Sequence, residues 1–280
     1  MEARDGKQTD MSPERFDIIP AASFPSIDLM MIPPGPSLAR WVQCMWVALK
    51  PPHAQSVIAE KLYPDGGTSL TFVIDNTGAS ARFFHHNQVT TYHWNMSKHH
   101  ISIRFRPGGA TALLGLDISD IHNMETDLLE LPFPHLADLT RLLDTLPVLS
   151  VTERLSAIQH WLSELTYRAH LPERKWSALL AYASANLVPP QQAANLKGVS
   201  RRTLERQLRK QFGHSPNQLH SYAQIRHARQ RLMNTSDRLS DIALDCGYFD
   251  QSHFSNAFRE QTLETPSEYR QRKLSQISNP

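Results

Sequence analysis

The sequence has few cysteines and no long apolar run. Among its 280 residues the cysteines are Cys44 and Cys246, which lie far apart without a CxxC pair or a Cys/His finger spacing. A disulfide framework and a structural zinc site are therefore not expected, and a reducing compartment fits this composition. No apolar run approaches the roughly 20 residues that span a bilayer, and Met1–Thr9 lacks the apolar core of a signal peptide. We expect a soluble, cytoplasmic protein with no membrane partner.

Negative charge is scarce toward the C-terminal end. The whole chain has a formal net charge of +2, but from Val188 onward 14 Lys and Arg residues accompany 8 Asp and Glu residues. Five of these basic residues fall between Arg201 and Lys210. A local basic excess attracts a polyanion such as a nucleic acid, although a basic helix face is also typical of a solvated surface. Charge alone leaves both interpretations open.

The N-terminal half shows the pattern of short strands followed by helices. Strand-like segments occur at residues 69–74, 79–84, 89–94 and 101–105. Beyond Ala110 the apolar spacing becomes helical, and Ser150 with Glu153 forms a capping box that opens a helix. We therefore predict a small β-barrel or sandwich with helices over residues 1–170.

A helix-turn-helix pattern occurs twice in the remainder of the chain. In each copy alanine and glycine stand four apart before a polar helix cap: Ala194, Gly198 and Ser200, then Ala243, Gly247 and Asp250. A unit repeated at a fixed period determines architecture more firmly than composition does. The chain is thus predicted to be α+β, with an all-α domain over 171–275 that contains two helix-turn-helix subdomains joined by a long helix.

The second helix of the first copy carries candidate DNA contacts. Leu204 and Leu208 are spaced to face inward, which leaves a basic outer face. The N-terminal turns of such a helix reach base edges in the major groove, where arginine pairs with guanine. Arg202 and Arg206 are the main candidates, and Glu205 could accept from cytosine or orient an arginine. The predicted DNA-binding residues of this copy are Arg201, Arg202, Glu205, Arg206 and Arg209.

The second copy offers amides and hydroxyls where the first offers charge. Phe254 and Phe258 take the buried positions, so polar residues face outward. Gln251 and Asn256 could pair with adenine, or Asn256 could hold the DNA backbone. The predicted DNA-binding residues of this copy are Gln251, Ser252, His253, Ser255 and Asn256. We expect this copy to contribute less of the affinity.

A long helix is expected between the two copies. Ser215 and Pro216 open it, and its apolar spacing continues to about Met233. About 17 residues give a rod roughly 25 Å long, whereas successive major grooves on one face of DNA are about 34 Å apart. Two recognition helices joined by this rod, helped by DNA bending, could enter adjacent grooves.

The C-terminal motifs resemble the DNA-binding domain of the AraC/XylS family of bacterial transcription regulators. The resemblance lies in Gly247-Tyr248, in Asp250-Gln251-Ser252-His253-Phe254 and in Thr265-Pro266-Ser267-Glu268-Tyr269-Arg270. It implies two helix-turn-helix subdomains and double-stranded DNA as the partner. RNA polymerase, a small-molecule effector and a second copy of the chain are further partners that the resemblance allows. One departure is Leu263, which stands where the family has glycine, so we expect that turn to differ locally.

The N-terminal half resembles the N-terminal domain of a poorly characterised subset of these regulators. The matching motifs are Tyr63-Pro64-Asp65-Gly66 and Arg104-Phe105-Arg106-Pro107-Gly108-Gly109. The resemblance implies a sensing or dimerising role for this half. Arg104 and Arg106 are candidates for an anionic effector, with structural ion pairing as the alternative.

A metal-binding or catalytic barrel fused to a DNA-targeting module is the alternative function. Histidines lie among the expected strands, but their spacing matches no metal motif and we expect them at the surface. They are His85, His86, His93, His99 and His100. No Ser/His/Asp arrangement, paired carboxylates or phosphate loop is present, so we predict no enzyme activity, no metal and no cofactor. A protein-interaction scaffold is a further alternative. A scaffold would not need to present polar side chains at matching positions of two helices, so the repeat argues against it.

Overall fold

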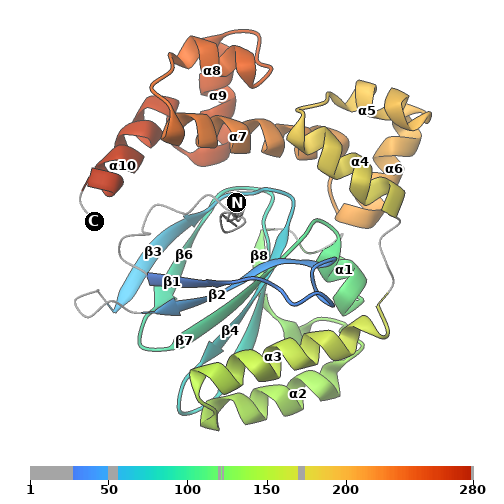
Figure 1. Ribbon diagram of the computed structural model, residues 1–280, viewed down its shortest axis with the longest axis vertical. Helices are drawn as coiled ribbons and strands as arrows, with labels where there is room; N and C mark the ends of the chain where they lie inside the picture. The colour runs from blue at the N-terminus through green and yellow to red at the C-terminus, as the bar shows by residue number, and fades with distance from the viewer. Residues whose placement is uncertain (1–27, 50–55, 119–120, 122, 170–173, 279–280) are drawn as a thin grey trace, which may run out of the picture.

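The computed structural model has an α+β N-terminal part and a helical C-terminal part (Figure 1). It describes residues 28–49, 56–118, 121, 123–169 and 174–278. Met1–Thr9 and the expected domain boundary at 170 and 171 lie outside these residues. Within the described segments, no helix is both long and apolar enough to cross a membrane.

The N-terminal strands form two antiparallel sheets. The main sheet has the order β1-β2-β7-β4-β5-β8, and β3 pairs with β6 in a second sheet. The strands are β1 Asp28–Ile32, β2 Val42–Leu49, β3 Val57–Leu62, β4 Thr68–Ile74, β5 Ala79–His85, β6 Thr90–Asn95, β7 His99–Phe105 and β8 Met124–Asp127. All four segments with the strand pattern are therefore strands. The described strands close no barrel, so the barrel alternative is not realised.

Helices cover one face of the main sheet. Leu70, Phe72 and Ile74 alternate along β4 and are fully buried on this face, as the period of two requires. The Phe72 ring meets Trp161 of α3 edge to face, with centroids 5.9 Å apart. Ser150 and Glu153 form the predicted capping box at the start of α3. The helical elements are α1 Gly109–Leu114, η2 Leu128–Glu130, α2 Leu136–Thr145, η3 Leu146–Val148 and α3 Val151–Thr166.

The small sheet covers the other face of the main sheet. Trp94 of β6 packs edge to face on His100, and Tyr92 does the same on Phe84, with centroids 5.0 and 5.1 Å apart. His100 donates from Nε2 to the carbonyl oxygen of Asn95 at 2.8 Å. The main sheet is thus buried between helices on one side and a two-stranded layer on the other.

The C-terminal helices form two small cores at the two ends of α7 (Figure 1). The first head comprises α4 Arg174–Ala185, α5 Pro190–Lys197 and α6 Arg201–Phe212, and the second comprises α8 Leu239–Asp245, α9 Gln251–Thr262 and α10 Pro266–Ser278. Helix α7, Pro216–Asn234, contributes Leu219 to the first core and Ile225, Ala228 and Leu232 to the second. Its 19 residues give a rod of about 28 Å. The long helix predicted between the copies is therefore present and begins at the predicted Ser215 cap.

The turn at Leu263 keeps the geometry of its counterpart in the first copy. Gly213 and Leu263 both adopt the left-handed conformation, with φ of 72° and 58°. Each amide donates to the carbonyl oxygen four residues earlier, at Arg209 and Arg259 respectively. The expected local difference is therefore wrong. The leucine side chain is 66% exposed, so the turn retains it without needing room in the core.

Replacing Leu263 with glycine is expected to raise the free energy of unfolding by about 1 kcal/mol. A non-glycine residue in the left-handed region costs roughly 1–2 kcal/mol, and glycine's greater freedom in the unfolded chain offsets part of this gain. Urea unfolding measures the change. The matched variant Gly213→Ala should lower the free energy of unfolding, because it places a side chain at the equivalent left-handed turn. A destabilised Leu263→Gly protein would contradict the left-handed conformation at Leu263.

Candidate nucleic-acid interface

Helix α6 is fixed at its start by a cap and along its length by buried side chains. The Ser200 hydroxyl accepts a hydrogen bond from the Thr203 amide at 3.2 Å, which satisfies one of the free amides of the first turn. Leu204, Leu208 and Phe212 are buried in the core of the first head. The outward face of α6 is therefore set by rigid packing on its inner face.

The predicted contacts of the first head fall into two groups. Arg202 and Arg206 are exposed, and no described residue forms a hydrogen bond or ion pair with either side chain. Arg209 donates from Nε to Glu205 at 2.8 Å, so this carboxylate orients an arginine. Arg201 is half-buried and donates to Asn217 Oδ1 at 2.7 Å. Arg202 and Arg206 are thus the arginines of this set that are free to engage a ligand.

The second head presents its predicted residues on α9. The Asp250 carboxylate accepts from the His253 amide at 2.7 Å and caps the helix. Phe254 and Phe258 are fully buried, as predicted. The His253 ring packs edge to face on Tyr248 at 5.3 Å. Gln251, Ser252, His253 and Asn256 are exposed, and Ser255 is half-buried.

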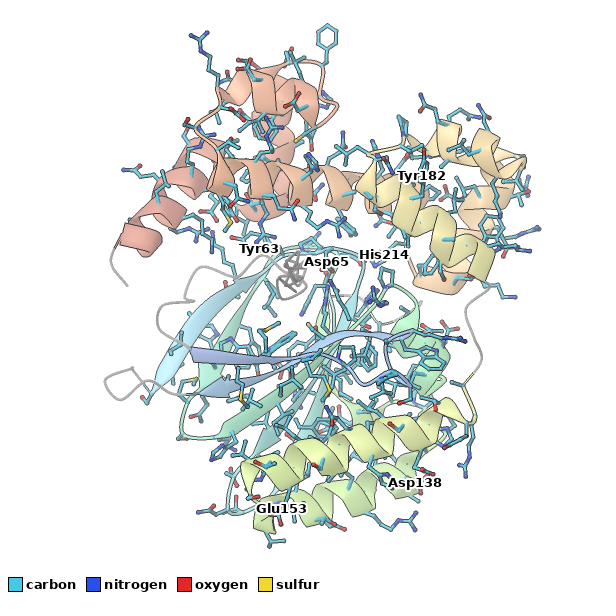
Figure 2. The ribbon with its side chains drawn as sticks, viewed as in Figure 1. Tyr63, Asp65, Asp138, Glu153, Tyr182 and His214 are labelled. Carbon is cyan, nitrogen blue, oxygen red and sulfur yellow. The ribbon has the colours of Figure 1, made fainter. Side chains whose placement is uncertain are left out.

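The N-terminal part contacts both heads at matching positions. His214 follows the left-handed residue that ends α6, and Glu264 follows the one that ends α9; each precedes the cap of the next helix. We call these two side chains the corner residues. Figure 2 places Tyr63, Asp65 and His214 along the boundary between the sheet and the helices above it. Sequence reasoning missed this role, although both corners stand at the same position of the repeat.

The Glu264 corner is a charged cluster. Its carboxylate, 9% exposed, accepts two hydrogen bonds from Arg272 at 2.7 and 2.9 Å and one from the Tyr63 hydroxyl at 2.9 Å. Lys61 lies 3.3 Å away, and the Arg229 guanidinium stacks 3.9 Å from the Tyr63 ring centre. Burial acts to raise the pKa of Glu264, but the hydrogen bonds and charge of Arg272, with Tyr63 and Lys61, hold that pKa below its ordinary value.

The His214 corner is packed among rings and backbone. Its imidazole lies 4.9 Å from the ring centre of His85 and 5.4 Å from that of Tyr222. Tyr222 donates to the Asn87 carbonyl oxygen at 3.2 Å, which joins α7 to the turn between β5 and β6. Gly66 has a φ of 80°, and a Cβ there would come 2.8 Å from Leu219. The 63–67 turn therefore approaches α7 closely and needs glycine to do so.

The candidate effector residues do not form a shared open site. Arg104 forms an ion pair with Asp65 and donates to Ser69 at 2.9 Å. Its burial lowers the pKa of the guanidinium to about 10. Arg106 donates from Nε to the Ala39 carbonyl oxygen at 2.9 Å. Arg104 thus pins the 63–67 turn to strand β7, in line with the structural alternative.

The histidines divide between interior and surface. His85 and His100 are buried, so the expectation of surface histidines is wrong for these two. His93 and His99 are exposed, and His86 is half-buried. Across the residues that the structure describes, no three His, Cys, Asp or Glu side chains gather as metal ligands. No observation in these segments favours the alternative of a metal-binding or catalytic barrel.

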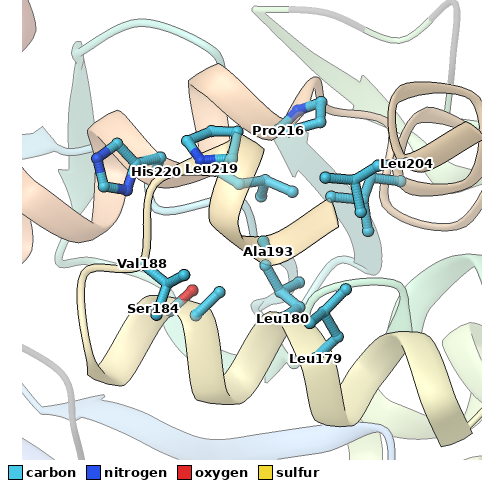
Figure 3. Close-up of a pocket in the computed structure, with 12 residues that line it drawn as sticks. Leu179, Leu180, Ser184, Val188, Ala193, Leu204, Pro216, Leu219 and His220 are labelled. Atoms are coloured by element: carbon cyan, nitrogen blue, oxygen red, sulfur yellow. The ribbon is translucent and has the colours of Figure 1, made fainter. Parts of the chain in front are cut away.

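A small apolar pocket lies within the first head (Figure 3). Leu179, Leu180, Ala193, Leu204 and Leu219 contribute to its walls, and its volume is about 30 Å³. Pockets for small-molecule ligands usually measure roughly 300–1,000 Å³. This pocket is therefore a packing gap between helices rather than a place for an effector.

Comparison with known proteins identifies two segments. Residues 193–272 match a helix-turn-helix domain family, and residues 30–127 match a domain of unknown function, DUF6597. The chain is 37% identical over 78 residues to the HTH-type transcriptional activator RhaS of an Enterobacter species, covering 28% of each protein. It is 39% identical over 75 residues to the HTH-type transcriptional regulator ArgR of Pseudomonas aeruginosa, covering 27% of this chain and 23% of the relative. The matches thus span about a quarter of these relatives.

A solved structure is also similar. It is a transcriptional regulator with an AraC-type DNA-binding domain from Chromobacterium violaceum, with 31% sequence identity and a TM-score of 0.33. The similarity covers 35% of this chain and 91% of that one.

Proposed function

We propose that the helix-turn-helix domain over residues 193–272 is of the AraC type and that the protein is a sequence-specific DNA-binding transcription regulator. Double-stranded DNA is its partner in this proposal. The relatives RhaS and ArgR are a transcriptional activator and a transcriptional regulator by name. We extend regulation of transcription to this chain, with RNA polymerase as a second partner.

The observation that carries the proposal is the free basic face of α6. Arg202 and Arg206 remain exposed although the N-terminal part is docked against the same head. Lys210 and Arg209 extend the exposed basic surface toward the end of the helix. Long cationic side chains on a rigid helix suit both phosphate binding and guanine recognition in the major groove.

Two recognition helices on one rod suit two neighbouring grooves. Helices α6 and α9 belong to heads at opposite ends of α7, which is about 28 Å long. Major grooves on one DNA face repeat about every 34 Å. The proposed contacts are those predicted above, with Arg202 and Arg206 on guanine, and Gln251 and Asn256 on adenine.

The N-terminal part is proposed to control the heads through the corner residues. It contacts Glu264 and His214, which follow the two recognition helices, and it leaves the outward faces of those helices exposed. An effector or a second copy of the chain would act by shifting these contacts. The N-terminal part would then regulate DNA binding by changing the relative placement of the heads rather than by covering them.

Selection from a random duplex pool with the full-length protein tests the proposal. The protein should enrich one sequence and bind it with strong salt dependence, because each neutralised phosphate releases counterions. About six such contacts would lower the affinity roughly 10³-fold between about 50 and about 200 mM salt. Failure to enrich a sequence, or binding that is insensitive to salt, would contradict the function.

A further inference from the structure

The two helix-turn-helix copies differ by one inserted residue. In the first copy the Gly198 and Val199 amides donate to Asn195 and Ala194, and the cap Ser200 follows directly. In the second copy the Gly247 and Tyr248 amides make the equivalent bonds to Leu244 and Ala243, but Phe249 intervenes before the cap. These matching bonds align Val199 with Tyr248. Phe249 therefore has no counterpart in the first head.

The inserted phenylalanine is held outward by its neighbours on both sides. Tyr248 is buried against Phe254, with ring centres 5.4 Å apart. Asp250 is fixed by its hydrogen bond from the His253 amide. The backbone at Phe249 is thus tied at both ends, while its ring is 88% exposed. A large apolar ring in water forgoes the stabilisation that burial would give it.

We propose that Phe249 is a specificity-determining residue that contacts the methyl group of a thymine in the half-site bound by the second head. This inference rests on the proposed DNA-binding function. Phe249 immediately precedes the cap of α9, and the first turn of a recognition helix lies closest to the base edges. The thymine methyl is the apolar feature of the major-groove pattern, and phenylalanine can pack against it.

The neutral surface of the second head favours this ligand chemistry. Alignment of Ser200 with Asp250 places Ser252 and Asn256 where the first head has Arg202 and Arg206. The second head therefore lacks the arginines that recognise guanine. The amides can pair with adenine, and the Phe249 ring can pack on thymine. Both contacts recognise A·T pairs, so this half-site should be A·T-rich.

Deoxyuridine substitution tests the contact, because it removes the thymine methyl and leaves base pairing unchanged. The probe is a duplex enriched by the full-length wild-type protein, with its thymines replaced one at a time by deoxyuridine. Burying one methyl contributes about 0.8 kcal/mol, or roughly a fourfold change in Kd. We expect one substitution in the second half-site to weaken wild-type binding by about fourfold. Phe249→Ala should weaken binding of the unmodified duplex by a similar factor and should be insensitive to that substitution.

The control variants separate this contact from general effects. Phe249→Tyr should retain the methyl effect, because it keeps the ring. Val148→Ala, which truncates an 84% exposed side chain in η3, should bind as the wild type. If only the predictions for Phe249 fail, the proposed DNA-binding function still stands. A wild-type protein that enriches no duplex would overturn that function itself.

Three results would overturn the inference. In the first, Phe249→Ala binds the duplex as tightly as the wild type does. In the second, Phe249→Ala stays as sensitive as the wild type to each deoxyuridine, which would place the methyl contact elsewhere. In the third, Phe249→Ala binds DNA normally but impairs transcription with purified RNA polymerase, which would assign the ring to a protein partner.

Discussion

Alanine at both Arg202 and Arg206 is expected to weaken binding of the selected duplex by about 100-fold or more. A bidentate arginine–guanine contact contributes roughly 1–3 kcal/mol of discrimination, and two such contacts are removed together. Both side chains are exposed and form no hydrogen bond or ion pair with the described residues, so the fold should be unaffected. Fluorescence anisotropy with a labelled duplex measures the change in Kd, and thermal unfolding tests the fold.

An arginine elsewhere on the surface provides the matched control. Arg141 on α2 is 77% exposed and lies in the N-terminal part. Arg141→Ala should bind the duplex as the wild type does. A second selection with the Arg202/Arg206 double variant should also lose the guanine preference of one half-site. Unchanged affinity and unchanged preference would remove these two residues from the interface.

Replacing Glu264 with alanine is expected to lower the free energy of unfolding by about 2–3 kcal/mol. Removing one partner of a buried ion pair costs about 3–5 kcal/mol because the other charge stays without compensation. The expected loss of stability is smaller here because Arg272 and Lys61 are partly exposed. Urea unfolding of the full chain measures the loss. Tyr63→Phe, which removes one hydrogen bond, should cost about 1 kcal/mol, and wild-type stability in Glu264→Ala would contradict the cluster's role.

The same corner predicts a pH dependence. The folded-state pKa of Glu264 lies below its ordinary value of 4.5, so the stabilisation is complete above that pH and is lost as the pH falls through the folded value. The stability difference between the wild type and Glu264→Gln should therefore shrink on acidification. Unfolding at several pH values from about 7 to about 3.5 tests this. A difference that stays constant or grows would contradict the ionised state of this carboxylate.

Local signals made the heads predictable from the sequence. Ser200, Ser215 and Asp250 cap their helices as their residue types predict. Phe254 and Phe258 replace Leu204 and Leu208 at the same buried spacing. Helical period and capping depend on residues within a few positions of one another, so a repeat of both patterns was sufficient to define these elements.

Long-range packing made other parts of the fold unpredictable. Strands β3 and β8 are short and depend on partners far along the chain, where Val57 pairs with Asn95 and Arg82 pairs with Asp127. His85 is buried because β5 ends against the first head, which no local pattern indicates. Leu263 kept the left-handed turn because hydrogen bonding and the helix that follows outweigh a modest backbone cost.

The candidate site was predictable on its outer face but not at its corners. The repeat predicted that Arg202 and Arg206 lie on the exposed face of α6, as they do, whereas the hydrogen bond between Arg201 and Asn217 depends on how α6 meets α7. Glu264 and Tyr63 are about 200 residues apart in sequence, and their hydrogen bond follows from domain docking. Phe249 could have been found from the sequence, because the second copy has one more residue than the first between its glycine and its cap.

The most direct test of two-groove binding is interference by single 7-deazapurine substitutions in the selected duplex. This change removes the N7 acceptor that arginine uses on guanine and that Gln or Asn uses on adenine. We expect two clusters of interfering purines about 10 base pairs apart. One cluster should consist of guanines and be abolished by Arg202→Ala. The other should consist of adenines and be abolished by Asn256→Ala. Interference confined to one major groove, or clusters unaffected by these variants, would contradict binding by two heads held on one helix.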